Sequence, residues 1–294
     1  MMKGSPHSPT RRDALKTTAT LLGALSLPGI TDLLAASAGR FTIGACDWSI
    51  GMRARVGAMS LAREFGIDGA QISMGGVEND LHLRRLDVQR AYREAAAAHG
   101  VRIAGIGLDI MNEVPYKSDP RTIQWVSDSI DVARALDVQV VLLAFFVKGD
   151  LKKDPEGQAE VIRRLKAIAP KAEGAGVTLG IESWLSAEEH MRIIDAVKSP
   201  NVKVYYDVAN SHHMGYDIYS EIRALGREHI CEFHAKENGF LLGQGRIDFA
   251  RVRQALDDIG YTGWIQIEGA IPEGKPMFES YVENARFMRG RFQE

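Results

Sequence analysis

The sequence predicts a single (β/α)8 barrel. From Phe41 onward, short apolar runs alternate with longer helical patterns eight times, which is typical of parallel strands joined by helical crossovers. Eight such units in about 256 residues match a closed TIM barrel of ordinary size. An open dinucleotide-binding sheet would need a glycine-rich turn after its first strand, and the segment Cys46-Asp47-Trp48-Ser49 contains none. No linker or change in composition divides residues 39–294, so we expect one domain there.

The predicted strands are the apolar runs, and the predicted helices lie between them. The expected strands are residues 41–47, 69–73, 102–108, 138–146, 177–183, 202–207, 230–234 and 264–268. Helical patterns occupy residues 87–98, 122–136, 155–174, 187–197 and 249–259. Several helices meet glycines, which commonly end helices: Gly100 before the third strand, Gly174 and Gly176 before the fifth, and Gly260 before the eighth.

Residues 1–38 predict a twin-arginine export signal. Arg11-Arg12 is followed by Leu15 and a weakly apolar run at residues 17–27, which is too short to span a membrane. Farther on, Ala36-Ser37-Ala38 has the small-residue pattern of a signal peptidase site. The alternative is an amphipathic helix of the fold, but four Lys/Arg against two Asp make this segment basic and leave about −4 on the body. We therefore expect the twin-arginine export machinery as a partner, a periplasmic location and no stable membrane insertion.

Overall charge and cysteine usage exclude several classes of protein. The chain has 36 Lys+Arg against 38 Asp+Glu, a net charge of −2, so it has no bulk positive field to hold a nucleic acid. Its two cysteines, Cys46 and Cys231, lie too far apart in sequence for a disulfide framework or a multi-thiolate metal site. The sequence is compatible with a homo-oligomer and does not specify an oligomeric state.

Four polar side chains stand at the ends of the last four predicted strands: Glu182, Asp207, His234 and Glu268. Because the carboxyl ends of barrel strands form the working face, these residues can converge on one point. Three carboxylates and one imidazole favour Mn2+ or Mg2+, with Co2+ or Zn2+ as alternatives. The competing interpretation is that each residue separately caps its strand. It is weaker for all four together, because a buried acid is costly unless a charge compensates it.

The chain resembles the xylose isomerase-like barrel superfamily, and within it the sugar phosphate isomerase/epimerase group that includes ketose 3-epimerases. The resemblance runs from Phe41 to about Phe287. The motifs that carry it are Gly66-Ile67-Asp68-Gly69, Gly180-Ile181-Glu182, Tyr206-Asp207-Val208-Ala209-Asn210, Phe233-His234-Ala235-Lys236-Glu237-Asn238, Gly243-Gln244-Gly245-Arg246-Ile247-Asp248-Phe249 and Ile267-Glu268-Gly269. Each motif is a modest signal, but their order and spacing are specific.

The resemblance implies roles for individual residues. It assigns the metal to the four strand-end residues named above, and it makes Glu182 and Glu268 the proton-transfer pair. Glu188 stands six residues after Glu182, where the epimerases have a glutamate that contacts substrate. Asn210 stands where they often carry a histidine, and it can still hydrogen-bond a hydroxyl. Phe240 stands where an arginine is common in them, six residues after the metal histidine, so the chain departs from the family pattern here and the resemblance does not specify the substrate.

Further substrate contacts are expected from residues near the strand ends. Lys236 either polarises a carbonyl, binds an anionic group or is a solvated loop lysine. Trp184 and Trp48 can stack on a sugar face, and packing against the core or rim is the alternative. Of the two loop histidines, His212 and His213, we place His213 among the substrate-binding residues, with simple exposure as the alternative.

The chemistry expected of this set is proton abstraction next to a carbonyl. A bound cation stabilises the developing charge, one carboxylate removes the proton and an acid on the other face returns it. The function predicted is a metal-dependent sugar isomerase or epimerase. A leaving hydroxyl beta to the carbanion would make the enzyme a lyase or dehydratase, and a non-catalytic sugar-binding barrel is a further alternative. An endonuclease IV-like enzyme is disfavoured because only His234 among the histidines ends a strand. Export favours non-phosphorylated sugars or keto-glycosides as substrates.

Overall fold

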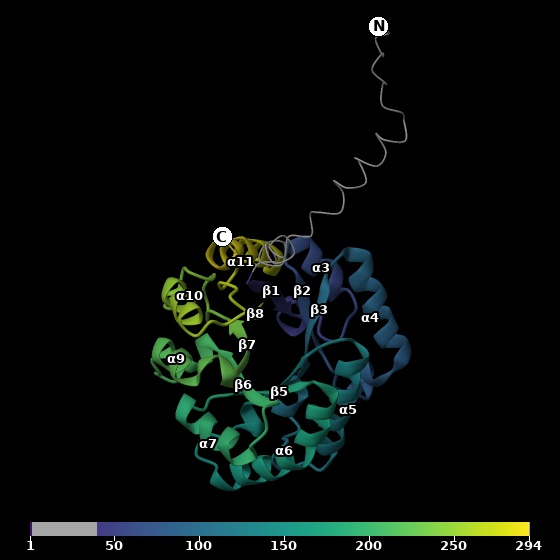
Figure 1. Ribbon diagram of the computed structural model, residues 1–294, viewed down its shortest axis with the longest axis vertical. Helices are drawn as coiled ribbons and strands as arrows, with labels where there is room; N and C mark the ends of the chain where they lie inside the picture. The colour runs from purple at the N-terminus through teal and green to yellow at the C-terminus, as the bar shows by residue number, and fades with distance from the viewer. Residues whose placement is uncertain (2–39, 294) are drawn as a thin grey trace. The chain divides into compact units, whose positions relative to one another are not determined.

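The computed structural model describes residue 1 and residues 40–293, so the predicted export signal lies outside the described residues apart from Met1. Eight parallel strands close into one barrel in the order β1 to β8, with β8 paired to β1. The predicted single-domain (β/α)8 barrel is confirmed. The strands line the centre and the helices surround them (Figure 1). No helix among the described residues is both long enough and apolar enough to cross a membrane.

The strands lie where the apolar runs predict them, to within two residues at each end. They are β1 (Phe41–Cys46), β2 (Gly69–Ser73), β3 (Arg102–Leu108), β4 (Val140–Phe145), β5 (Thr178–Ser183), β6 (Val202–Asp207), β7 (Ile230–Ala235) and β8 (Gly263–Ile267). Side chains alternate between the two sides of each strand. Leu179 and Ile181 of β5 pack in the main core, which the strands form with the surrounding helices, so Gly180 and Glu182 face the barrel interior.

The helices lie around the barrel as the sequence predicts, and the structure adds others. They are α3 (Ala58–Phe65), α4 (Leu86–His99), α5 (Arg121–Ala135), α6 (Pro155–Ala175), α7 (Ala187–Val197), α8 (Val208–His213), α9 (Ile218–His229), α10 (Phe249–Asp258) and α11 (Met277–Phe292). Gly100 and Gly176 end α4 and α6 in the left-handed conformation, as expected of helix-ending glycines. Gly174 instead lies inside α6.

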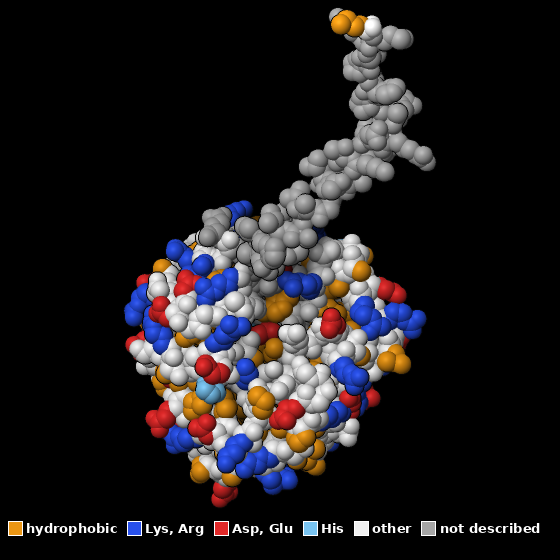
Figure 2. Space-filling view, viewed as in Figure 1, with side chains coloured by type: hydrophobic (Ala, Val, Ile, Leu, Met, Phe, Trp, Pro, Cys, Tyr) orange, Lys and Arg blue, Asp and Glu red, His pale blue; other side chains and the backbone are white. Residues whose placement is uncertain are grey.

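The barrel interior holds a small apolar cluster and an unusual number of polar groups. Val140, Leu142 and Ala144 of β4 pack there with Tyr205 of β6. The other strands contribute buried polar side chains, which include Gln71, Glu232, His234 and Gln266. Outside, acidic and basic side chains are interspersed over the face seen in Figure 2, without a large area of one sign. The interior therefore carries the polar groups that need a functional explanation.

Candidate active site

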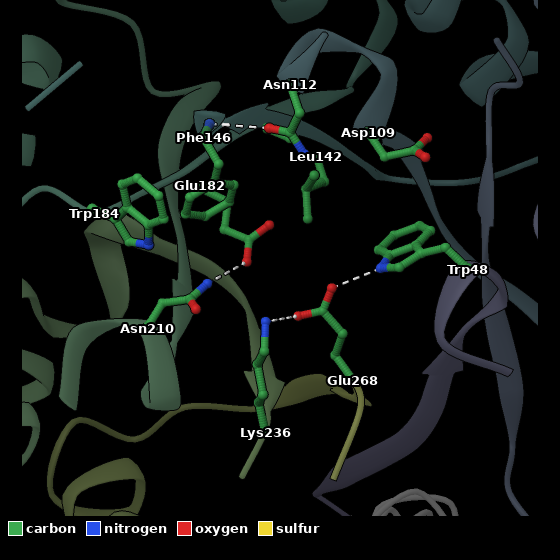
Figure 3. A pocket seen from close by; sticks show the side chains of 11 residues that line it. Trp48, Asp109, Asn112, Leu142, Phe146, Glu182, Trp184, Asn210, Lys236 and Glu268 are labelled. Carbon is green, nitrogen blue, oxygen red and sulfur yellow. Dashed lines mark hydrogen bonds and ion pairs between the residues drawn. The ribbon is translucent and has the colours of Figure 1, made fainter. Parts of the chain in front are cut away.

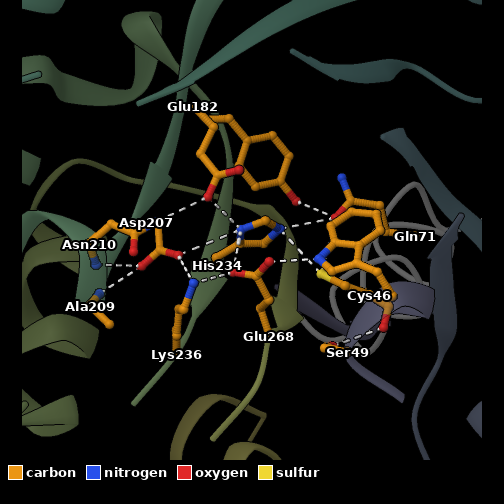
Figure 4. A network of polar contacts seen from close by, with 12 residues as sticks. Cys46, Ser49, Gln71, Glu182, Asp207, Ala209, Asn210, His234, Lys236 and Glu268 are labelled. Carbon is orange, nitrogen blue, oxygen red and sulfur yellow. Dashed lines mark hydrogen bonds and ion pairs between the residues drawn. The ribbon is translucent and has the colours of Figure 1, made fainter. Parts of the chain in front are cut away.

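The ends of strands β5 to β8 bring four metal-capable side chains together. Glu182, Asp207, His234 and Glu268 each place one ligand atom within 4.8 Å of the ligand atoms of the other three. The Nδ1 atom of His234 lies 3.0 Å from Glu182 Oε1, 3.5 Å from Glu268 Oε2 and 3.8 Å from Asp207 Oδ2 (Figure 4). The convergence expected from the strand ends is therefore present in the folded chain.

Asp207 has two separate tasks at this site. Its Oδ1 atom accepts hydrogen bonds of 2.8 Å from the backbone N–H groups of Ala209 and Asn210, and so caps the N-terminus of α8. Its Oδ2 atom is buried and accepts no hydrogen bond among the described residues. Burial raises the pKa of Asp207 to about 7. A buried carboxylate oxygen without a donor needs a compensating positive charge.

Lys236 supplies part of that charge. Its Nζ atom lies 2.8 Å from Glu268 Oε2 and 3.5 Å from Asp207 Oδ2, and 23% of its side chain is exposed. Burial would lower the pKa of Lys236, but Glu268 and Asp207 outweigh it and raise this pKa well above its usual value. Burial alone would raise the pKa of Glu268, whereas Lys236 and His234 hold it well below its usual range. Lys236 is therefore an ion-pair partner inside the site rather than a solvated loop lysine.

The donor set fits a hard divalent cation. Three carboxylates and one imidazole nitrogen are the ligand types that Mn2+ and Mg2+ accept, and Zn2+ and Co2+ also bind such sets. The buried Asp207 Oδ2, which accepts no hydrogen bond among the described residues, and the clustering of the four ligand atoms support a cation at this position. A cation there would share Glu268 and Asp207 with Lys236.

A cavity of about 330 Å³ borders the cluster, and Glu182 and Glu268 line it. Its lining residues are Trp48, Asp109, Asn112, Leu142, Ala144, Phe146, Glu182, Trp184, Asn210, Lys236 and Glu268 (Figure 3). Trp48 donates a hydrogen bond of 2.6 Å from Nε1 to Glu268 Oε1, and Phe146 packs edge to face against Trp184 with ring centroids 5.3 Å apart. The cavity thus combines aromatic walls with carboxylate and amide groups, as small-molecule binding sites commonly do.

The family follows from a sequence match that spans most of the barrel. Residues 59–291 match the model of the xylose isomerase-like TIM barrel family. The chain belongs to this family.

Relatives of this xylose isomerase-like barrel carry epimerase names. The chain is 26% identical over 230 residues to the L-ribulose-5-phosphate 3-epimerase UlaE of Salmonella heidelberg, covering 71% of this chain and 80% of that protein. It is 25% identical over 266 residues to the putative L-ribulose-5-phosphate 3-epimerase SgbU of Escherichia coli, covering 80% and 90% of the two chains.

Solved structures share the fold at lower identity. D-psicose 3-epimerase from Clostridium cellulolyticum H10 superposes with a TM-score of 0.72 at 19% identity, covering 86% of this chain and all of that one. The 3-keto-D-glucoside 4-epimerase YcjR of Escherichia coli superposes with a TM-score of 0.68 at 14% identity, covering 85% and 99% of the two chains. At these identities the two likenesses concern the fold.

The xylose isomerase-like barrel brings some of the predicted substrate contacts into its cavity and leaves others outside. Trp184, Asn210 and Lys236 line the cavity, and Trp48 does so as well. Asn210 donates from Nδ2 to Glu182 Oε1 at 3.5 Å, so it borders the metal cluster.

Glu188 and His213 do not reach this cavity. Ser186 caps α7, which places Glu188 in the first turn with 85% of its side chain exposed and paired with Arg192 at 3.3 Å. His213 ends α8, is exposed, and lines a separate hollow together with His212. The structure therefore places both side chains outside this cavity, and their substrate contacts stay a prediction.

Sequence reasoning did not assign a role to Asp109 or Asn112, which also line the cavity. Asp109 follows β3 and accepts hydrogen bonds from Ser73 Oγ at 2.6 Å and from Arg53 Nε at 2.5 Å. Asn112 accepts one from the backbone N–H of Phe146 at 3.0 Å. Their position after a strand end is the same signal that pointed to the four metal-capable residues.

Proposed function

We propose that this chain is a divalent-metal-dependent sugar isomerase or epimerase that moves a proton on the carbon next to a carbonyl. The observation that carries the proposal is the placement of Glu182 and Glu268. Glu182 lies in β5 and Glu268 directly follows β8, and both line the same cavity. His234 Nδ1 lies 3.0 Å from Glu182 Oε1 and 3.5 Å from Glu268 Oε2. The epimerase names of the relatives support the same class of reaction.

The two glutamates suit opposite halves of a proton transfer. Lys236 Nζ lies 2.8 Å from Glu268 Oε2 and favours the ionised form of Glu268, so we assign proton removal to Glu268. Glu182, which accepts a hydrogen bond from Asn210, returns a proton to the other face of the substrate carbon. A divalent cation held by Glu182, Asp207, His234 and Glu268 would stabilise the negative charge that develops on the substrate oxygens. Mn2+ is the cation we propose first, before Mg2+, Co2+ and Zn2+.

The substrate we propose is a sugar, keto-sugar or keto-glycoside without a phosphate group. Lys236 is the cationic side chain among the lining residues, and it is already paired with Glu268 and Asp207. A phosphate would therefore meet carboxylates at this cavity and no free cation. The relatives named as acting on L-ribulose 5-phosphate would differ from this chain in that respect.

We also propose that the chain is exported through the twin-arginine route. Export agrees with an unphosphorylated substrate, because phosphorylated sugars are confined to the cytoplasm by their charge. The test is fractionation of cells that express the full chain. We expect a periplasmic product cleaved after Ala38, and retention in the cytoplasm when Arg11→Lys and Arg12→Lys are combined. Periplasmic delivery of the double variant would contradict this route.

The activity is tested with a panel of free ketoses, keto-glycosides and their phosphates, incubated with the purified protein and Mn2+ in deuterated water. We expect deuterium at the epimerised carbon and an inverted configuration in at least one non-phosphorylated compound. Loss of one water from the product would instead identify a lyase. Bound metal with no exchange into any compound would contradict the isomerase proposal and favour a sugar-binding role.

A further inference from the structure

A layer of buried polar side chains lies one step below the metal cluster inside the barrel. Tyr205, Glu232 and Gln266 stand two residues before Asp207, His234 and Glu268, and Gln71 joins them from β2. All four are at most 2% exposed. Branched aliphatic residues usually fill this part of a barrel, and burying polar groups instead costs stability. Such a layer therefore calls for a functional reason.

The imidazole of His234 connects this layer to the three carboxylates of the metal cluster. Its Nδ1 atom faces the carboxylates, whereas its Nε2 atom lies 3.0 Å from Gln71 Oε1 and 3.3 Å from Cys46 Sγ (Figure 4). A neutral imidazole carries one N–H group, and a nitrogen that binds a metal must offer its lone pair. For Nδ1 to bind a cation, the hydrogen must therefore sit on Nε2.

Gln71 provides the acceptor that this arrangement needs. Its Oε1 atom also accepts from Cys46 Sγ at 3.3 Å, whereas its Nε2 atom has no hydrogen-bond partner among the described residues. Tyr205 donates its hydroxyl proton to Glu232 at 3.0 Å, and its oxygen lies 3.4 Å from Gln71 Oε1. The shortest polar contact of the Gln71 amide is thus the one to His234. A side chain kept at the cost of an unpaired amide nitrogen is best explained by that contact.

We propose that Gln71 is a positioning residue for the metal site: its carbonyl oxygen accepts the Nε2–H of His234, fixes that tautomer and turns Nδ1 toward the cation. Cys46 makes a second, weaker contact with the same nitrogen. The inference rests on the proposed metal dependence. It adds the residue that fixes the tautomer and the orientation of the His234 imidazole. Partners of this kind typically contribute 10- to 100-fold to metal affinity.

The test measures Mn2+ affinity of the full chain after removal of metal, by electron paramagnetic resonance of the free ion. Gln71→Met removes the acceptor with little change of volume, and we expect binding weaker by about 10- to 100-fold. Gln71→Glu keeps an oxygen acceptor, and we expect affinity within a few-fold of the parent protein. Gln266→Met is the matched control. Gln266 is equally buried in the same layer and donates to Glu232 at 3.3 Å, and among the described residues its side chain makes no hydrogen bond with His234.

A second measurement reports the tautomer directly. With ring-15N histidine and Mg2+ or Zn2+ bound, we expect one His234 resonance of a protonated Nε2 in the parent protein and in Gln266→Met. In Gln71→Met with the same metal bound, we expect this proton to exchange faster with solvent, because it has lost its hydrogen-bond acceptor. A merely structural role of Gln71 would change thermal stability and leave the exchange rate of this proton unchanged.

The outcomes separate this inference from the proposed function. If the parent protein fails to bind Mn2+, Mg2+, Co2+ or Zn2+, the metal-dependent function is wrong. If the parent binds Mn2+ and Gln71→Met binds it equally well, or Gln266→Met weakens it as much as Gln71→Met, the positioning role of Gln71 is wrong. The same conclusion follows if Gln71→Glu binds as weakly as Gln71→Met.

Discussion

Replacement of Glu268 by glutamine should abolish most turnover while preserving the barrel. Glu268 is 14% exposed, accepts the indole N–H of Trp48 at 2.6 Å and faces Lys236 at 2.8 Å. Glutamine has the same shape and keeps an oxygen toward Trp48, but it offers no base and no negative charge. Loss of a general base typically slows a reaction by 10²- to 10⁴-fold, which corresponds to about 3–5 kcal/mol of activation free energy.

The same substitution should change stability much less. The lost charge-assisted hydrogen bond is worth about 1.5–3 kcal/mol, and Lys236 retains Asp207 at 3.5 Å. The assay is deuterium incorporation into the best substrate of the panel, followed by NMR, alongside urea unfolding. Glu283→Gln on the exposed side of α11 serves as the control for a Glu-to-Gln change. A folded Glu268→Gln protein with turnover close to that of the parent would refute the assignment of Glu268 as the base.

Three other predictions follow from the site and its surroundings. Removal of metal with a chelator should stop deuterium exchange, and Mn2+ at 100 times its dissociation constant should restore exchange and add about 2.7 kcal/mol of stability; activity that survives chelation would contradict metal dependence. Burial raises the pKa of Asp47 from 3.8 to about 8, so the folded state holds a proton there that the unfolded chain releases, and stability should fall as pH rises from about 4 to 8. Asp47→Asn should remove this contribution of up to about 1.4 kcal/mol per pH unit, as measured by urea unfolding at several pH values, and parallel profiles for the two proteins would disprove it. Glu188→Gln should leave kcat/KM within about twofold of the parent value, because Glu188 is exposed and paired with Arg192. A tenfold loss of kcat/KM would contradict this and support the substrate contact that the family resemblance implies.

The barrel could be predicted because its signals are local. Each strand is a short apolar run bounded by turn residues, and these runs remain visible without any knowledge of their partners. Helices α8 and α9 were harder to foresee. The segment after Asp207 contains Asn210, His212 and His213, which are ordinary loop residues, and it forms a helix because the Asp207 side chain caps it. A cap of this kind depends on a side-chain orientation that apolar periodicity does not report.

The site was predictable where a residue ends a strand, and less so elsewhere. Parallel strands of a barrel all finish at one face. The strand-end positions of Glu182, Asp207, His234 and Glu268 therefore predict that these side chains converge. Glu188 stands six residues after Glu182 but does not line the cavity. The hydrogen-bonded cap at Ser186 starts a helix there and directs the next turn toward solvent.

The sequence alone thus determined the number and order of strands, the end of the barrel that carries the site, and the types of ligand available there. The tertiary structure decided which groups touch. Trp48 meets Glu268 across 220 residues and Gln71 meets His234 across 163, and neither pair shares a sequence signal. Both contacts depend on the closure of the barrel and on the register of β1, β2, β7 and β8. Closure and register arise from the packing of the whole chain, whereas strand formation and side-chain alternation are properties of each short segment.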